Sequence, residues 1–273
     1  MHDDSHHHGL PHDLKVLHRR QLLRLTAGVG VMTLFACSDD GSAIDETGAT
    51  TDNTTGDSPT GGGSCPSIPE ETAGPYPGDG SNGANALILT GIVRSDIRTS
   101  IADASGTADG VPLTITLTIV DSTCTPLANH AVYLWHCDRD GAYSMYTGSA
   151  SAENYLRGVQ ETDADGKVTF LSIFPACYSG RWPHMHFEIY SSLATATSGN
   201  NDVKTSQLAL PAAACNQVYG VASGYDASVA NFARVSLASD GIFGDDQAAT
   251  QLATVDGSVS AGFTATLTVG ISA

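Results

Sequence analysis

The sequence predicts an all-β protein: an antiparallel β-sandwich of the immunoglobulin or prealbumin kind, with few short helices and long loops. Three observations predict this fold class. Many short segments alternate apolar and polar residues, turn sequences separate them, and few windows have helical periodicity. The chain has 273 residues, and the part before residue 65 is poor in apolar residues apart from one short run. We therefore expect a single folded domain at 65–273.

The clearest predicted strand is 113–120, in which leucine and isoleucine alternate with threonine. Such alternation is typical of a strand with one buried face. Other strands are expected at 87–98, 130–137, 167–174, 184–190, 232–237 and 263–271. Aspartate and glycine mark turns at 138–141 and 163–166. Two windows have some helical character, 206–223 and 246–253.

The N-terminal stretch 1–36 is predicted to be a twin-arginine export signal. Arg19 and Arg20 precede a short apolar run at 25–36, which is too short to span a membrane. The run ends in Ala36 and Cys37, which resemble a bacterial lipid-attachment site, although Phe35 is bulkier than usual there. An ordinary cleaved signal peptide or an uncleaved anchor is the alternative. We expect a periplasmic or cell-envelope location with a lipid anchor at Cys37.

Residues 37–64 are almost free of apolar side chains, so they are predicted to be a flexible linker between the lipid anchor and the domain. The net charge of −17 argues against binding to nucleic acid. It also argues against attachment to anionic lipid by charge. A membrane is therefore expected as a partner only through the anchor at Cys37. The oligomeric state stays open, and a homo-oligomer is compatible with the sequence.

The chain has six cysteines. If Cys37 carries lipid, an odd number remains for pairing: Cys65, Cys124, Cys137, Cys177 and Cys215. Disulfides are expected for most of these in an exported protein, and their connectivity is left open. The spacing that indicates a zinc site of paired cysteines is absent from the sequence.

Residues 184–190 carry the strongest functional signal. His184 and His186 are two apart on a predicted strand, so both imidazoles leave the same face. Tyr178 precedes them, and Tyr143 follows the turn at 138–141; Tyr146 is a rival to Tyr143. Two phenolates with two imidazoles favour Fe(III) over zinc or copper(I), because phenolate is a hard anionic donor.

The pattern resembles the intradiol ring-cleavage dioxygenases, the family of catechol and protocatechuate dioxygenases. The matching stretches lie at 71–76, 94–98, 134–138, 141–143, 155–163, 174–178 and 181–187. The resemblance implies a non-haem Fe(III) held by Tyr143, Tyr178, His184 and His186, with Tyr178 and His184 in axial positions. It further implies that Arg181 stabilises negative charge that develops on the substrate ring. Gln207 falls where the family often has a glutamine near the site.

The activity implied by the resemblance is cleavage of a catecholic ring between its two hydroxyl-bearing carbons. O2 is the second substrate, and a muconate-type diacid is the product. Tyr178 and His184 are closer in sequence than in the well-studied members, so which catechol is the substrate stays open. The alternatives are an extracytoplasmic β-sandwich that binds a ligand or carbohydrate and keeps a vestigial metal site, and a copper protein. His136 is expected to be a buried structural residue. His130 is expected to be exposed.

Overall fold

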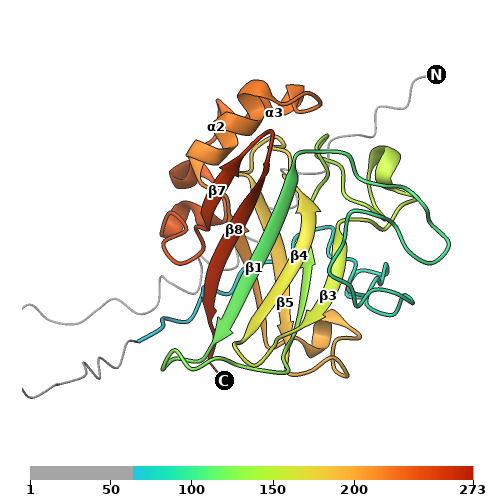
Figure 1. The fold of residues 1–273 in the computed structure, drawn as a ribbon, viewed down its shortest axis with the longest axis vertical. Helices are drawn as coiled ribbons and strands as arrows, with labels where there is room; N and C mark the ends of the chain where they lie inside the picture. The colour runs from blue at the N-terminus through green and yellow to red at the C-terminus, as the bar shows by residue number, and fades with distance from the viewer. Residues whose placement is uncertain (1–63, 273) are drawn as a thin grey trace, which may run out of the picture.

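The computed structural model describes residues 64–272 (Figure 1). The expected export signal at 1–36, the lipid site at Cys37 and almost all of the linker at 37–64 lie outside these residues. Within the described part, no helix has the length and apolar character that a membrane span requires.

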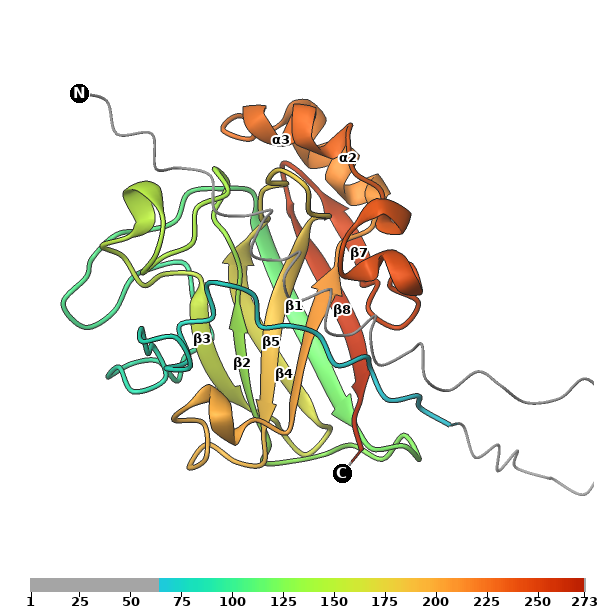
Figure 2. The same ribbon diagram turned by 180° about the vertical axis from the view of Figure 1, so that it is seen from behind.

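The described residues form two four-stranded sheets that pack face to face (Figures 1 and 2). The first sheet has the order β4-β1-β8-β7, and its strands are Lys167–Ile173, Pro112–Val120, Gly262–Gly270 and Thr254–Ser258. The second has the order β3-β2-β5-β6, with strands Arg157–Glu161, Ala131–Trp135, His184–Tyr190 and Lys204–Ala209. The expected β-sandwich is thus confirmed. One pair departs from antiparallel order, because β1 and β8 run parallel.

The main core lies between the two sheets. It takes the inward residues of β1, which are Leu113, Ile115, Leu117 and Ile119, and those of β5, which are Met185, Phe187 and Ile189. The outward threonines of β1 are half-buried, as the alternation predicts. Each fully buried aliphatic side chain of this kind contributes about 1.5–3 kcal/mol to folding.

The second sheet is covered on its other face as well. The N-terminal segment crosses that face (Figure 2), and it packs there on a second cluster that includes Tyr133, Trp135 and Tyr190. As a result, every residue of β5 is buried. Polar side chains on this strand must therefore find partners inside the protein.

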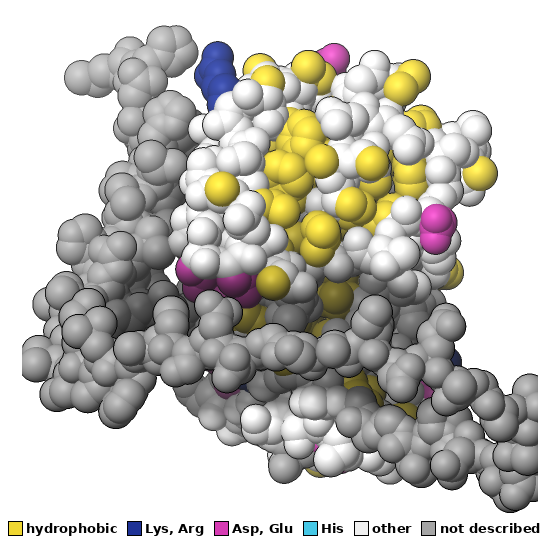
Figure 3. All heavy atoms as spheres, turned by 90° about the vertical axis from the view of Figure 1, so that its left-hand side faces the viewer, with side chains coloured by type: hydrophobic (Ala, Val, Ile, Leu, Met, Phe, Trp, Pro, Cys, Tyr) yellow, Lys and Arg dark blue, Asp and Glu magenta, His cyan; other side chains and the backbone are white. Residues whose placement is uncertain are grey.

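The helices are few and lie on one side of the sandwich. They are α2 (Ala212–Val221) and α3 (Asp226–Phe232), together with short 3-10 turns at Gly148–Ala150, Gly199–Asn201, Leu237–Ser239 and Phe243–Asp245. The side that carries them shows apolar side chains and few charges (Figure 3). Val221 and Val229 are exposed there.

Several expected elements differ from those observed. Residues 87–98 form only isolated bridges, at Val93 and Asp96, rather than a strand. The expected strand at 232–237 is instead the end of α3 and a turn. The helical window 206–223 is divided, because β6 pairs with β5 and α2 begins only at Ala212. The window 246–253 contains no helix; it is mostly turn and ends in an isolated bridge between Leu252 and Ala209. These segments are short and weakly periodic, so tertiary pairing outweighs local propensity.

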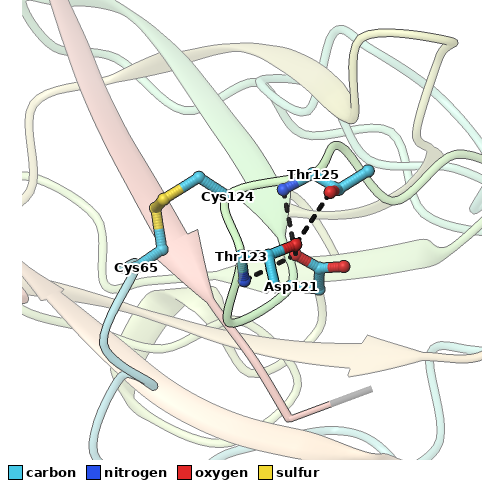
Figure 4. The surroundings of a disulfide bond; sticks show 5 residues. All are labelled: Cys65, Asp121, Thr123, Cys124 and Thr125. Atoms are coloured by element: carbon cyan, nitrogen blue, oxygen red, sulfur yellow. Dashed lines mark hydrogen bonds between the residues drawn. A yellow bond between two sulfur atoms is a disulfide. The ribbon is translucent and has the colours of Figure 1, made fainter. Parts of the chain in front are cut away.

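The expectation that most cysteines form disulfides is wrong for the described residues. Cys65 bonds to Cys124, and this bond ties the first described residues to the loop between β1 and β2 (Figure 4). In that loop, Asp121 Oδ1 accepts bonds from the amides of Thr123 and Thr125. The remaining thiols, Cys137, Cys177 and Cys215, are free and buried. They therefore behave as small core residues.

His136 joins the two sheets near the end of β2. Its Nδ1 bonds to the Cys137 carbonyl at 2.7 Å and its Nε2 to Ser172 Oγ of β4 at 2.7 Å. The pKa of this imidazole is lowered to about 4, chiefly by burial; the bond to the Cys137 carbonyl partly opposes this shift, and nearby Arg157 adds to it. The expectation of a buried structural histidine is confirmed, whereas His130 is half-buried rather than exposed.

We expect loss of the Cys65–Cys124 bond to lower the free energy of unfolding by about 4 kcal/mol, because it closes a long loop in the unfolded chain. The two cysteines are 59 positions apart. Urea unfolding of Cys65→Ala/Cys124→Ala measures the change. Wild type under reducing conditions is the control and should show the same loss; an unchanged midpoint in both would contradict the prediction.

Acid should destabilise the metal-free domain through His136. The folded pKa lies near 4 and the unfolded value is 6.5, so the unfolded chain binds the proton first as pH falls. The stability associated with the neutral imidazole is complete above pH 6.5, and about 2.5 kcal/mol of it is lost by pH 4.5. Urea unfolding of wild type and His136→Gln at pH 7.5 and 4.5 tests this. The difference between the two proteins should shrink by that amount; a constant difference would refute it.

Candidate metal centre

β5 fixes the two histidines. Because Met185, Phe187 and Ile189 face the core, His184 and His186 face the opposite side of the sheet, where the N-terminal segment covers them. Their Nε2 atoms are 3.1 Å apart. The expected pair of neighbouring imidazoles is thus present on one rigid strand.

Two tyrosine hydroxyls reach the same point from separate loops. Tyr178 Oη lies 3.1 Å from His184 Nε2, and Tyr143 Oη lies 3.3 Å from His186 Nε2. The two phenolic oxygens are 3.5 Å apart. Tyr143 comes from the loop that follows β2 and Tyr178 from the connection between β4 and β5. Four potential ligand atoms from three segments therefore meet around one point.

Tyr146 does not join this group. Its hydroxyl accepts a bond from the Gly78 amide at 2.9 Å and donates to Asn82 Oδ1 at 2.7 Å. Of the two tyrosines that the sequence left in competition, the structure places Tyr143 beside the histidines.

The histidine rings are held in orientations that suit ligation. His184 Nδ1 lies 2.5 Å from the Trp182 carbonyl, which can only accept, so the proton is on Nδ1 and Nε2 is available to a metal. His186 stacks on Trp135, with ring centroids 5.0 Å apart and planes 9° apart. Within the described residues, His186 Nδ1 is buried and has no hydrogen-bond partner. Trp135 thus acts as packing for a site residue.

Arg181 borders the site and is itself firmly held. Its NH1 atom lies 3.4 Å from His184 Nε2, and its NH2 donates to Gln207 Oε1 at 2.7 Å. Its Nε donates to Asp240 Oδ2 at 3.0 Å, where the carboxylate is fully buried. Gln207 also donates to the Thr72 carbonyl, and in the sheet it lies opposite His186. Both expected site residues therefore lie beside the histidine pair.

Asp240 is the residue that sequence reasoning missed. It lies in the C-terminal third, in a turn with no motif, 59 positions from Arg181. Its Oδ2 also accepts the Trp182 amide, and its Oδ1 accepts the amides of Ile242 and Phe243. Nothing in its local sequence marks it out, because its role depends on a contact made only in the folded chain.

Electrostatics leaves the two kinds of ligand in different states. Burial, with nearby Arg181, lowers the pKa of His184 and of His186 well below the usual histidine range, so both imidazoles are neutral and able to bind metal. Burial raises the pKa of Tyr143 well above that of a free phenol. Burial disfavours a charged Arg181, but Tyr178 and Asp240 outweigh it and raise its pKa. A phenolate at Tyr143 therefore needs a cation beside it.

The donor set fits a metal ion. Neighbouring ligands on bonds of about 2.1 Å are separated by about 3.0–3.6 Å, which matches the distances of 3.1–3.5 Å found here. Two axial ligands would instead be about 4.2 Å apart. The 3.1 Å between Tyr178 Oη and His184 Nε2 therefore does not fit the expectation that these two are the axial pair. Within residues 64–272, no cluster of three or more His, Cys, Asp or Glu could hold a metal. At the point described here the oxygen donors are tyrosine hydroxyls, and two phenols with two imidazoles suit a hard ferric ion.

Removal of the Asp240 carboxylate should lower the free energy of unfolding much more than removal of a surface carboxylate. Asp240→Ala leaves Arg181 buried without its anion, so we expect the free energy of unfolding to fall by about 3–5 kcal/mol. Asp96→Ala is the matched control, because the Arg98–Asp96 pair is exposed at 41% on both sides; it should cost about 1 kcal/mol or less. Urea unfolding of the metal-free domain measures both. Equal losses would count against a buried ion pair.

Comparison with known proteins agrees with this site. A family model described as "Dioxygenase" matches residues 94–185, a range that includes Tyr143, Tyr178, Arg181 and His184. Catechol 1,2-dioxygenase 2 of Acinetobacter lwoffii is 36% identical over 93 residues, which cover 34% of this chain and 33% of that protein. The chain thus matches about a third of the length of this curated relative.

Similarity to solved structures extends further along the chain. An intradiol ring-cleavage dioxygenase from Tetranychus urticae superposes with a TM-score of 0.58 at 25% identity, over 76% of this chain and 95% of that one. A second solved dioxygenase gives 0.57 with the same identity and coverage. In its matched segment the chain is similar to dioxygenases, and in the fold of its described residues it is similar to intradiol ring-cleavage dioxygenases.

Proposed function

We propose that this protein is a non-haem Fe(III) dioxygenase that cleaves a catecholic ring with O2 between its two hydroxyl-bearing carbons and yields a muconate-type diacid. The observation that carries the proposal is the meeting of two phenol oxygens and two imidazole nitrogens at 3.1–3.5 Å. A carbohydrate-binding sandwich needs no such buried set. Tyr143, Tyr178, His184 and His186 would hold the iron.

A bound ferric ion would act as a Lewis acid and as a template that orients the substrate. The residues of the chain prepare the place for this chemistry. His184 and His186 offer neutral nitrogens on a rigid strand. Trp135 stacks on His186 and keeps its ring from turning. The N-terminal segment crosses this side of the sheet, and both histidines are buried.

The two tyrosines differ in burial, and we assign them different roles. Tyr143 is fully buried, and its amide is bonded to Thr147 Oγ1, so it is suited to remain in place. Tyr178 is half-buried and precedes the exposed Ser179 and Gly180. Tyr178 would therefore be the ligand with room to move when a catechol enters, and as a phenolate its Oη would accept a proton from a catechol hydroxyl.

Arg181 supplies a fixed positive charge at the edge of the site. Gln207 and Asp240 hold two of its nitrogens, which leaves NH1 directed toward His184. A guanidinium that is held in advance stabilises negative charge as it develops on the ring, with little reorganisation during the reaction. Arg181 is thus the proposed electrostatic catalyst, and Gln207 and Asp240 are positioning residues.

We also propose twin-arginine export and a lipid anchor at Cys37. The support is the sequence at 19–37 alone. Twin-arginine export carries folded proteins, so iron would be inserted before export.

The visible absorption spectrum of the purified domain with Fe(III) tests the function, before and after anaerobic addition of catechol. A red-brown protein with a tyrosinate-to-iron charge-transfer band is expected, and catechol should shift the band to longer wavelength. Tyr178→Phe should alter the band and abolish ring cleavage. Tyr146→Phe is the matched control and should leave the band in place, because its hydroxyl bonds elsewhere.

A protein that takes up no iron and stays colourless would refute the dioxygenase proposal and favour a binding module. Copper uptake without the tyrosinate band would favour a copper protein. A band that catechol does not move would keep the iron site and reject catechol as substrate.

A further inference from the structure

Arg157 is a buried arginine that the proposed mechanism does not use. It begins β3, where it pairs with Trp135 of β2, and it is 1% exposed. An isolated buried cation is costly unless polar atoms surround it. The identity of the atoms around Arg157 therefore indicates what it is for.

Each N–H of the guanidinium has an acceptor. Nε donates to Ser144 Oγ at 3.0 Å, and NH2 donates to the Ser144 carbonyl at 2.9 Å and the Tyr76 carbonyl at 2.9 Å. NH1 donates to the Pro77 carbonyl at 2.6 Å and to Tyr133 Oη at 3.0 Å. None of these acceptors is a carboxylate. The charge is thus stabilised by neutral oxygens, most of them from two loops.

These two loops lead directly to the metal centre. Ser144 follows Tyr143 in the chain, and Tyr76 packs its ring 5.1 Å from the Tyr143 ring. The guanidinium also lies over the Tyr146 ring, 5.5 Å from its centroid. Hydrogen bonds from a charged donor are about twice as strong as neutral ones. Arg157 therefore joins the loop of a proposed ligand to the loop that packs against it.

Backbone conformation around this junction is unusual. Met145, next to Ser144, has φ +70°, and Leu156, next to Arg157, has φ +56°. A non-glycine residue rarely adopts this region, and it persists only where surrounding contacts hold it. The Met145 amide bonds to the Glu153 carbonyl at 2.8 Å. At Gly78, φ is +63° and a Cβ would lie 2.8 Å from Arg157 NH1, so glycine permits the close approach.

We propose that Arg157 is a positioning residue: it sets the Tyr143 ring, and the Tyr76 ring beside it, in the orientation that the metal centre requires. This rests on the proposed function. The guanidinium is suited to the task because its planar fork bonds two loops and β2 at once in fixed directions. Lysine offers one rotating ammonium and cannot reproduce that arrangement.

The test compares Arg157→Lys with wild type. Arg94→Lys is the matched control, because Arg94 bonds to the carbonyls of Thr99, Asn154 and Arg157 and, among the described residues, to none of the acceptors in the loops that Arg157 joins. Fe(III) affinity is measured by competition with a chelator. Arg157→Lys should lose about 10- to 100-fold in affinity and shift the tyrosinate band, as loss of a supporting contact to a ligand typically does. Arg94→Lys should keep wild-type affinity and band.

A second measurement needs no metal. Hydrogen–deuterium exchange of the metal-free proteins should be faster at 76–78 and 143–147 in Arg157→Lys, and unchanged at β1 and β8. If wild type itself binds no Fe(III), the proposed function fails, and this exchange experiment still decides the role of Arg157. Unchanged exchange would then overturn it.

If wild type binds iron, unchanged affinity and exchange in Arg157→Lys would overturn the proposal. An equal loss in Arg94→Lys would also overturn it, because the effect would then be general destabilisation. If Arg157→Lys does not fold, Ser144→Ala and Tyr133→Phe take its place, since each removes one acceptor. Smaller changes of the same kind would support the positioning role, and no change in either variant would reject it.

Discussion

Burial of β5 on both faces is the constraint on which the rest of the structure depends. One face supplies apolar residues to the core between the sheets, and the other carries His184 and His186 under the N-terminal segment. Polar side chains in such a place have to be bonded within the protein. The register of β5 with β2 and β6 provides neighbours for His186, which lies between Trp135 and Gln207. The same pairing that completes the sheet therefore arranges the candidate site.

Two buried arginines support this site in different ways. Arg181 is paired with a buried carboxylate, so its charge is balanced and its nitrogens are fixed beside His184. Arg157 is surrounded by carbonyl and hydroxyl oxygens, and its charge serves to hold loops together. Both rely on the planar, directional donors of guanidinium. Arg181 lies beside His184. Arg157 bonds to the loops that carry Tyr76 and Ser144.

Without a metal, the proposed ligand side chains His184, His186 and Tyr143 are uncharged. Burial favours neutral imidazoles at His184 and His186, and it favours a protonated phenol at Tyr143. A cation changes this balance for the phenol and leaves the imidazoles as they are. In the proposed iron site, metal binding would therefore be linked to release of the phenol proton. The half-buried Tyr178 has easier access to water, which suits a ligand that moves.

The sequence by itself determined the β-sandwich and the histidine pair, because strand alternation and the His-x-His spacing are local patterns. Tyr143 and Tyr178 followed from the resemblance to a family, with Tyr146 as the less favoured rival of Tyr143. The sequence missed α3 and misplaced strands at 87–98 and 232–237. Only the tertiary structure brought Asp240 to Arg181 and Arg157 to Ser144 and Tyr76, and only it showed three cysteines as free core residues. The physical reason is that a buried charge is paired with groups from segments that only the fold brings close together. Local sequence patterns do not show which distant segments these are.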